Sequence, residues 1–519
     1  MRQAVRSLLI WTIVRDAVYV RSCAQKGRLP WWWSSHAEDN GKGKSAEVFM
    51  DVDIKKLAKD LSRIVGKEHV FTDKPTSVVY AKDTMPWDLE EQNIPYAVVR
   101  PANGQEVSGI LRYANERLIP VHTHGSGTSL VGLARPKTNC IVLDTARMKD
   151  TRVYPERGYF EAGPGVHLAQ LRKELEQHNA LLPVFPGSEL VATFGGTIAV
   201  NTSAHGVDAA LGKPGDFILG FELVLPTGEI ISTGTESTRR PAGIDPTKFF
   251  IGSEGLLGVL TLLRMRLIPL PHFQHIVASY RTTEDILDTV MEMYRQRIFP
   301  PLFFEYLDEK AAKIGYEAVG LDEPEGAVAM MRIHSWSKVG CEDRANNFLE
   351  FLKRGNPIEA RIVDDPEEWK MVWGSRAEAG NYMYRLGMTF GSEITPRVDK
   401  LREAFRDAKD FILNLDSYQG NEFISFGHIG APTIHAYAFV RTKDIPNELK
   451  KAIALEMREK SEELNIKYGG CGGEWGLTAQ RVSFLKGKYE KEVYESLVKL
   501  KKALDPNDIL NRGNLQGWM

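Results

Sequence analysis

The sequence predicts an α+β protein with two main domains. Helical and strand-like patterns both occur along its 519 residues, but they do not alternate steadily, as a doubly wound parallel sheet requires. Glycine is frequent, with 45 residues, and it gathers between residues 125 and 258. This glycine-rich region ends near Pro269-Leu270-Pro271, where we place a domain boundary. The length allows two or three domains.

Regular elements follow one another along the chain, each with its own local signal. Apolar residues recur at helical spacing from Ile54 to Val65, and Gly66 ends the run, which predicts a helix. Further helices are expected at residues 106–115, 168–177 and 449–457, strands at residues 97–99, 118–121 and 141–143, and a hairpin with strands at 221–225 and 229–232.

The composition is that of an ordinary globular protein, and it argues against several partners. With a formal net charge of -2, the chain has no global electrostatic reason to bind nucleic acid or membrane lipid. No run of 18 apolar residues occurs, so we expect no integral membrane segment. Cys23, Cys140, Cys341 and Cys471 form no CxxC pair and are too few for a disulfide framework, which indicates a reducing, cytoplasmic setting.

Residues 1–49 differ from the rest of the chain. They are rich in Arg and Lys and include Trp31, Trp32 and Trp33 in a row. They have neither the unbroken apolar stretch nor the small-residue cleavage site of a signal peptide. We expect a disordered leader, or translation that in fact begins at Met50. The alternative is a basic, aromatic anchor that holds the protein peripherally at a membrane.

A loop at residues 123–129 follows a predicted strand and has the chemistry of a phosphate-binding turn. Gly125 and Gly127 permit positive φ angles, and successive backbone amides in such a turn form a nest for an anion. Further donors are the neighbouring hydroxyl groups of Ser126, Thr128 and Ser129. By itself the loop could equally be an ordinary turn. A Rossmann loop is excluded, because Leu130 stands where that fingerprint needs a third glycine.

Five glycine-rich segments then follow in a fixed order. They are Gly163-Pro164-Gly165-Val166, Pro186-Gly187-Ser188, Gly195–Asn201, Val224–Glu229 and Gly252–Thr261. In this order and spacing they resemble the FAD-binding domain of the vanillyl-alcohol oxidase / p-cresol methylhydroxylase superfamily. The most similar branch is that of the glycolate oxidase subunit and D-lactate dehydrogenase. The resemblance is strong over residues 75–272 and looser over residues 273–519.

The resemblance implies FAD as cofactor, bound without a covalent link. Some relatives carry a flavin-linked histidine where this chain has Thr128; a histidine link from the second domain is the alternative. His205 stands where relatives often have glycine, and we interpret it as a loop or core histidine rather than a ligand. The residues expected to line the FAD are Thr123, His124, Gly125, Ser126, Gly127, Thr128, Ser129, Pro186, Gly187, Ser188, Gly195, Gly196, Thr197, Asn201, Glu254, Gly255 and Val259.

The resemblance also implies how the chain is divided. After the leader at residues 1–49, we expect an FAD-binding domain of two subdomains at residues 50–272. An α+β substrate domain, or cap, follows at residues 273–480, and residues 481–519 form a C-terminal segment that returns to the FAD domain.

Two histidines of the cap, His428 and His435, resemble a metal motif of the 2-hydroxy-acid branch. Glu474 matches the glutamate that completes that site, and such a set suits Zn²⁺, Mn²⁺ or Fe²⁺. The alternative is two strand-end histidines without a metal. The chain departs from the family around this metal motif: Asp-Gly-Asn between the histidines is Ala431-Pro432-Thr433, and the histidine that serves as base is Trp475. A tryptophan cannot take a proton.

Arg376 matches the arginine that pairs with the substrate carboxylate, a role that suits its two-pronged guanidinium. The alternative is a surface salt bridge. A lysine expected shortly before Pro396 is replaced by Phe390, so the pocket is more aromatic and less basic than that of a standard D-lactate enzyme. Its lining candidates, most of which could equally be core, are Trp336, Trp373, Tyr382, Tyr384, Phe390, Tyr437 and Trp475.

These features together predict an FAD-dependent oxidoreductase that oxidises a CH–OH group by hydride transfer to flavin N5. The expected substrate is a 2-hydroxy acid such as D-lactate or glycolate, and the expected catalytic residues are Arg376, His428, His435, Glu474 and Trp475. The alternatives are a phenolic or aryl-alcohol oxidase, a non-redox FAD enzyme resembling alkylglycerone-phosphate synthase, and a flavoprotein subunit that only relays electrons. An electron-acceptor protein and a homodimer are expectations that come from the family.

Overall fold

The computed structural model describes residues 52–83, 89–202, 205–237, 239, 243–442, 444–470, 476 and 491–514. The leader expected at residues 1–49 therefore lies outside the described residues, as do Glu474 and Trp475. Within the described part, no helix combines the length and the apolar character that crossing a membrane needs. Cys140 and Cys341, the two cysteines described, are buried and unbridged.

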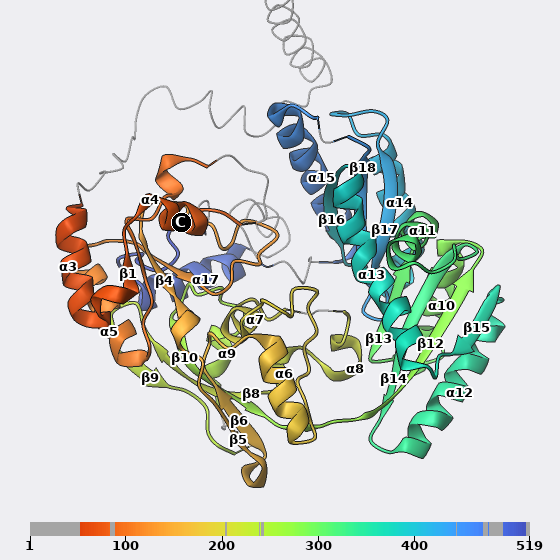
Figure 1. The fold of residues 1–519 in the computed structure, drawn as a ribbon, viewed down its shortest axis with the longest axis horizontal. Coiled ribbons are helices and arrows are strands. Elements are labelled where there is room, and N and C mark those ends of the chain that lie inside the picture. Colours follow the sequence, from red (N-terminus) through yellow and green to blue (C-terminus); the bar gives the residue numbers. More distant parts are fainter. Residues whose placement is uncertain are drawn as a thin grey trace, which may run out of the picture. The chain divides into compact units, whose positions relative to one another are not determined.

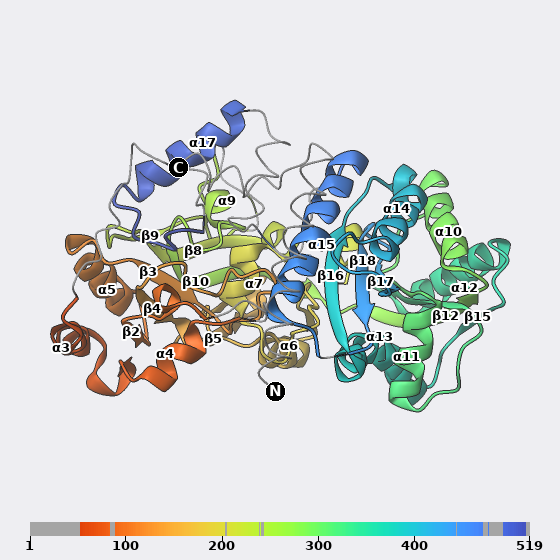
Figure 2. The same cartoon turned by 90° about the horizontal axis from the view of Figure 1, so that it is seen from above.

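The first half of the described chain contains a sheet of four strands, in which β2, β4 and β3 run parallel. Helices α3 and α5 pack against each other beside it, as both views show (Figures 1 and 2). The bounds are α3 Ile54–Val65, β1 Val70–Phe71, α4 Lys74–Tyr80, β2 Ala97–Val99, α5 Gly104–Glu116, β3 Val121–His124 and β4 Ile141–Asp144.

A second sheet of five antiparallel strands follows, in the order β5-β6-β10-β8-β9. Apolar side chains of these strands pack with those of α6 and α7 in one core. The bounds are β5 Thr151–Tyr154, β6 Tyr159–Ala162, α6 Leu168–Gln177, α7 Phe194–Val200, α8 Asp208–Leu211, β8 Ile218–Val224, β9 Ile230–Ser232, α9 Thr247–Phe250 and β10 Val259–Arg266. Two short strands, β7 Ala180–Leu181 and β11 Ile268–Pro269, pair with each other in a separate antiparallel sheet.

Several local predictions for this half are confirmed. Helix α3 ends where the sequence indicated, since Gly66 has a φ of 90°, which does not continue a helix. The hairpin is formed by β8 and β9, and the Leu225 amide donates to Glu229 O at 2.9 Å across the turn. The strand predicted at residues 118–121 is wrong in position. Leu118 has a φ of 55° and belongs to the turn after α5, so β3 begins only at Val121.

The second half is built on one antiparallel sheet of seven strands, in the order β15-β12-β14-β13-β17-β18-β16. The long helix α15 (Asn447–Tyr468) runs alongside the edge strand β16 in both views (Figures 1 and 2). The strands are β12 His272–Tyr280, β13 Phe303–Leu307, β14 Ala327–Ser335, β15 Glu359–Ile362, β16 Met388–Ile394, β17 Glu422–His428 and β18 Ile434–Val440. The other helices are α10 Thr283–Arg295, α11 Glu309–Val319, α12 Lys338–Arg354, α13 Pro366–Leu386, α14 Leu401–Leu413 and α17 Lys491–Leu504.

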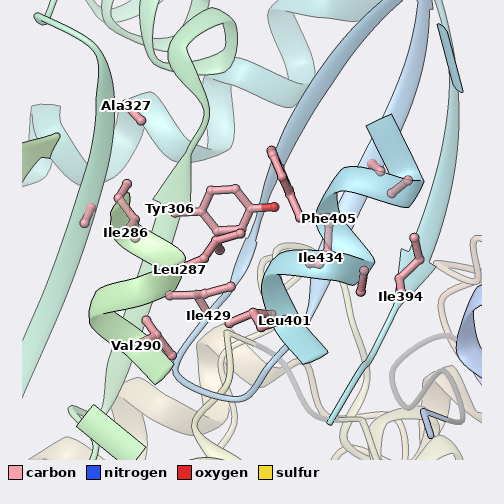
Figure 3. Packing of buried hydrophobic residues seen from close by; sticks show 14 of the residues in the cluster. Ile286, Leu287, Val290, Tyr306, Ala327, Ile394, Leu401, Phe405, Ile429 and Ile434 are labelled. Carbon is pink, nitrogen blue, oxygen red and sulfur yellow. The ribbon is translucent and has the colours of Figure 1, made fainter. Parts of the chain in front are cut away.

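Side chains of the central strand β13 point alternately to the two faces of this sheet, and their surroundings differ between the faces. Phe304 and Tyr306 enter a large apolar core with α10, α12, α14 and α15. Figure 3 shows Leu287 of α10 and Leu401 and Phe405 of α14 gathered around Tyr306. On the other face, Leu307 packs against α11 and α13. Glu305 shares that second face, so a carboxylate lies beneath α13. The predicted α+β class is confirmed.

Candidate active site

A glycine-rich loop follows the C-terminal end of β3. Its packing is close: a Cβ on Gly125 would lie 2.5 Å from Thr193 Oγ1, and Gly127 has a φ of 72°. Among the described residues, none accepts a hydrogen bond from the amides of residues 125–128. Within that part of the chain these amides are available to an anion, as a phosphate-binding nest requires.

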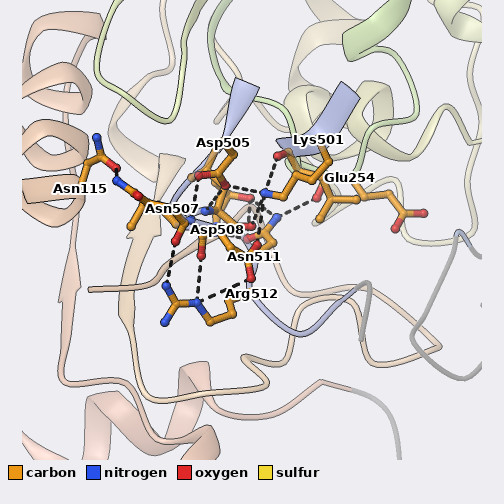
Figure 4. A network of polar contacts seen from close by, with 12 residues as sticks. Asn115, Glu254, Lys501, Asp505, Asn507, Asp508, Asn511 and Arg512 are labelled. Atoms are coloured by element: carbon orange, nitrogen blue, oxygen red, sulfur yellow. Dashed lines mark hydrogen bonds and ion pairs between the residues drawn. The ribbon is translucent and has the colours of Figure 1, made fainter. Parts of the chain in front are cut away.

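Asn511 ties this loop to two other segments, at the centre of the network in Figure 4. Its Oδ1 accepts a hydrogen bond from the Thr123 amide at 2.9 Å. Its Nδ2 donates to the Glu254 carbonyl at 2.8 Å and to Thr123 Oγ1 at 3.1 Å. The Glu254 amide in turn donates to Ala199 O at 2.8 Å. Segments that are far apart in sequence therefore meet around the loop.

The remaining residues predicted to line FAD fall into three places. Gly195 and Gly196 lie in the first turn of α7, and a Cβ on Gly196 would lie 3.1 Å from Thr193 Oγ1. Residues 186–188 form the turn that leads toward Thr193, since Ser188 O accepts the Val191 and Ala192 amides. Val259 is the first residue of β10 and is buried in the sheet.

A second polar group lies on the α13 face of the seven-stranded sheet. Glu305 of β13 stands directly opposite His428 of β17, and His435 of β18 stands opposite Phe426 of β17. Residues opposite one another in a sheet point to the same side. Arg376 enters from the middle of α13. Register and helix placement thus gather four residues that lie up to 130 positions apart in the sequence into one buried cluster.

Glu305 is the centre of this cluster. Its Oε2 accepts a hydrogen bond from Arg376 Nε at 2.8 Å, and its Oε1 lies 2.5 Å from His428 Nδ1. His435 Nε2 lies 3.1 Å from His428 Nε2. The exposed fractions are small: 0% for Glu305, 8% for Arg376, and 5% for each histidine. The Arg376 guanidinium also lies over the Phe426 ring, 4.3 Å from its centroid.

The charge state of Glu305 follows from its neighbours. Burial raises the pKa of this carboxyl, but His428 and Arg376 outweigh burial and hold the pKa well below its usual value. An ionised carboxylate only accepts hydrogen bonds, so His428 must carry a proton on Nδ1. If His428 is neutral, its Nε2 then has a lone pair, and the short Nε2–Nε2 distance requires a proton or a cation between the two rings.

His205 joins the cluster from the segment that follows α7. Its Nδ1 lies 3.4 Å from Glu305 Oε1, within ion-pair distance but outside hydrogen-bond geometry. Its ring centroid lies 5.1 Å from those of His428 and Trp373. Burial lowers the pKa of His205, which keeps the ring neutral near pH 7. Its φ of 52° is uncommon for a residue with a side chain, and such conformations concentrate at functional sites.

Two family models match the chain: an FAD binding domain over residues 95–234, and the C-terminal domain of FAD linked oxidases over residues 271–515. D-lactate dehydrogenase of Archaeoglobus fulgidus is 30% identical over 463 residues, which cover 88% of this chain and 98% of that protein. The chain belongs to the FAD-linked oxidase family. The predicted membership in the FAD-linked oxidases and the predicted FAD-linked oxidoreductase activity are thereby confirmed.

Two further comparisons agree with this assignment. The glycolate oxidase subunit GlcD of Bacillus subtilis is 28% identical to this FAD-linked oxidase over 470 residues, 89% of this chain and 97% of that one. A solved structure of p-cresol methylhydroxylase superposes with a TM-score of 0.70 at 17% identity, covering 89% of this chain and 96% of that one. At that identity the likeness shows the shared fold.

The residues of the FAD-linked oxidase around β3 fit the cofactor that the family implies. The loop offers amides rather than charges, and Gly125 and Gly196 leave no side chain over Thr193. Thr193 Oγ1 is buried, and no described residue is its hydrogen-bond partner. A buried hydroxyl without a partner is costly, so a ligand group at this point would satisfy it.

The structure places the other predicted site residues as follows. Arg376 is not at the surface: its salt bridge to Glu305 is buried. His205, interpreted as a loop or core histidine, lies in the cluster because the chain after α7 runs against the sheet, where a Cβ on Gly206 would lie 3.2 Å from His428 Cβ. Phe390 belongs to the apolar core, and Trp336 is 55% exposed, so neither lines the cluster. Glu474, Trp475 and the side chain of Tyr384 lie outside the described residues.

Glu305 is the site residue that sequence analysis missed. One signal could have found it, because it is the single acid in the apolar run Phe303–Leu307. A carboxylate in such a strand is buried only when it is paired. The sequence contains no sign of which residues pair with it, since they come from three other segments.

Proposed function

We propose that this FAD-linked oxidase oxidises the CH–OH group of a 2-hydroxy acid at the cluster around Glu305. The observation that supports this most is the arrangement of Arg376 beside His428 and His435, because it provides a recognition group for each function of such a substrate. The guanidinium suits a carboxylate, and the histidine pair suits the neighbouring hydroxyl. Lactate and glycolate, named in the two relatives, are both 2-hydroxy acids.

Arg376 would bind the substrate carboxylate through its two terminal nitrogens. Its Nε is engaged by Glu305, whereas no described residue accepts a hydrogen bond from the terminal nitrogens. Two parallel N–H groups on one planar cation match the two oxygens of a carboxylate. Because the guanidinium is almost fully buried, the ion pair with substrate would be screened little by solvent.

His428 and His435 would polarise the substrate hydroxyl, directly or through a divalent metal ion. The two Nε2 atoms, 3.1 Å apart, are close enough to bind one cation, and His428 Nδ1 is engaged by a carboxylate in the way typical of metal-ligating histidines. We propose Glu474 as a third ligand. A bound Zn²⁺ or Mn²⁺ would supply a Lewis acid that lowers the pKa of the hydroxyl.

FAD would be held by the loop at residues 123–129 together with the segments at residues 193–201 and 254–255. The cofactor supplies the hydride acceptor, and the protein's part is to bind, orient and desolvate the substrate. Val259 and residues 186–188 would complete the lining. A non-covalent FAD, a cytoplasmic location, an electron-acceptor protein and a homodimer stay predictions.

The test is anaerobic bleaching of the FAD-loaded full chain by a panel of substrates. We expect a D- or L-2-hydroxy acid to bleach the flavin. We expect Arg376→Lys to lower the affinity for that substrate by roughly 10–100-fold, since a charged hydrogen bond contributes about 1.5–3 kcal/mol. Arg361→Lys is the matched control, because Arg361 pairs with Glu359 and Glu368 near the surface.

The other outcomes would each reject the proposal in favour of a named alternative. Bleaching only by 4-alkylphenols or aryl alcohols would indicate a phenolic oxidase. No bleaching by either class would indicate a non-redox enzyme or an electron-relay subunit. Treatment with a metal chelator before the assay distinguishes direct polarisation of the hydroxyl from polarisation through a metal. Only an enzyme that uses the metal loses activity on this treatment and regains it when Zn²⁺ or Mn²⁺ is restored.

A further inference from the structure

Glu305 contacts three groups of the candidate active site, and each comes from a different part of the chain. Arg376 belongs to α13, His428 ends β17, and His205 lies in the segment after α7. Their nitrogens lie 2.8, 2.5 and 3.4 Å from the carboxylate oxygens. No exposed surface remains on Glu305.

A carboxylate buried this completely is costly unless every oxygen is paired. Here Oε2 is engaged by Arg376, and Oε1 by His428 with His205 close by. With both oxygens occupied, Glu305 is not itself placed to bind a substrate. Its contribution must pass through the residues that it holds.

The contact with each partner determines which atoms that partner presents. Because Nε of Arg376 is bound to Glu305, the terminal nitrogens are the ones left to face a ligand. Because His428 donates from Nδ1, a neutral ring presents the lone pair of Nε2, on the side of His435. One side chain therefore orients both the carboxylate-binding group and the hydroxyl-polarising group.

We propose that Glu305 is a positioning residue that couples carboxylate recognition by Arg376 to hydroxyl or metal binding by His428. This inference rests on the proposed function, since it takes the roles of Arg376 and His428 from there. Its specific consequence is that the two binding functions are lost together when Glu305 changes. A carboxylate that served only the fold would show no such coupling.

Glu305→Gln is the variant that tests this coupling. A glutamine offers one acceptor oxygen where the carboxylate offers two, so it cannot accept at once from Arg376 and from a His428 protonated on Nδ1, and its NH₂ group favours the other His428 tautomer. Glu422→Gln is the matched control, because Glu422 lies on the neighbouring strand β17 and also pairs with two cations, Lys310 and Arg441, away from the cluster.

The first measurement is histidine ¹⁵N NMR of the FAD-loaded full chain. In the wild type and in Glu422→Gln we expect His428, assigned through His428→Gln, to carry its proton on Nδ1. In Glu305→Gln we expect a mixture of the two tautomers. A wild-type His428 protonated only on Nε2 would overturn the proposal, whether or not any Glu305 variant folds.

The second measurement compares the affinities for two probes, Zn²⁺ alone and oxalate alone, by calorimetry. We expect Glu305→Gln to weaken Zn²⁺ binding by about tenfold or more, as changes to the carboxylate partner of a metal-ligating histidine do. We expect it to weaken oxalate binding too, because Arg376 loses the contact that orients its terminal nitrogens. FAD content and melting temperature serve as the check on folding. Affinities for both probes that match those of Glu422→Gln would overturn the proposal.

The two measurements separate the failure of this inference from the failure of the proposed function. If the wild type binds neither probe and no 2-hydroxy acid bleaches its flavin, the proposed function fails, and the NMR result still decides whether Glu305 orients His428. If the wild type binds both probes but Glu305→Gln binds them equally well, only the coupling role of Glu305 fails.

Discussion

Arg376 has two tasks at the scale of single residues, because it would bind substrate and it also neutralises Glu305. Its salt bridge is buried on both sides, with exposed side-chain fractions of 10% for Arg376 and 0% for Glu305. Removing one partner of such a pair leaves a buried charge without compensation. The guanidinium therefore contributes to the fold as well as to recognition.

We expect Arg376→Ala to lower the free energy of unfolding by about 3–5 kcal/mol. Arg361→Ala, which removes a partly exposed arginine with two carboxylate partners, should cost about 0–1 kcal/mol. Urea unfolding of the two variants and the wild type measures the difference. Equal stabilities of Arg376→Ala and Arg361→Ala would contradict the buried ion pair.

Asp308 gives a second prediction at this scale, because burial raises its pKa from 3.8 to about 7. Its oxygens cap α11 through the Ala311 amide and also accept the Ser425 amide. The folded state holds the proton more tightly than the unfolded state, so this contribution to stability is complete below about pH 4 and is lost as the pH rises through 7. Asp308→Asn should abolish this loss. Melting temperatures of both proteins at a series of pH values provide the test, and parallel curves above about pH 5 would count against it.

At the scale of elements, the local signals of the sequence were sufficient where a single segment decides its own structure. Helix α6 has the predicted bounds, Leu168–Gln177, and the hairpin of β8 and β9 forms around Pro226-Thr227-Gly228. The start of β3 was misplaced because Leu118 takes a positive φ after α5, which no apolar pattern indicates. Glu305 and His205 could not be assigned to the site, since their neighbours depend on sheet register and on the path of a distant loop.

The C-terminal segment illustrates how one element can support a cofactor loop at a distance. Lys501 donates to the carbonyls of Leu256 and Leu510 and pairs with Asp505, which fixes the chain before Asn511 (Figure 4). Asn511 then joins the backbone at Thr123 to that at Glu254. The geometry of the proposed FAD site therefore depends on residues far from any glycine-rich motif.

We expect Asn511→Ala to weaken FAD binding by about tenfold or more, because hydrogen bonds that shape the loop, each worth about 0.5–1.5 kcal/mol, are lost together. Asn507→Ala is the control from the same segment, since Asn507 bonds Asn115 at the surface. Flavin titration of the deflavinated variants measures both affinities. An Asn511→Ala protein that binds FAD as tightly as Asn507→Ala does would show that the loop holds its shape without the hydrogen bonds of Asn511.

At the scale of the whole molecule, buried histidines set the response to acid. Burial lowers the pKa of His122 and His275 to about 3 and that of His334 to about 4, from 6.5. The unfolded chain binds these protons first, so stability is present above about pH 6.5 and is lost as the pH falls toward 3. These histidines should therefore lower the urea concentration at the unfolding midpoint as the pH falls from about 7 to about 5, in opposition to Asp308. His334→Gln should reduce the slope of that fall, and an unchanged slope would show that His334 is not a neutral buried group.

A deuterium isotope effect tests whether the protein breaks the C2–H bond of a 2-hydroxy acid. The FAD-loaded full chain is mixed without oxygen with a 2-hydroxy acid, in one sample with hydrogen and in another with deuterium at C2. We predict that the flavin is bleached, that deuterium slows the bleaching because the C2–H bond breaks, and that Arg376→Lys raises the substrate concentration needed. A flavin that stays oxidised with every 2-hydroxy acid, in a protein that binds FAD and is folded, would rule out oxidation of this substrate class.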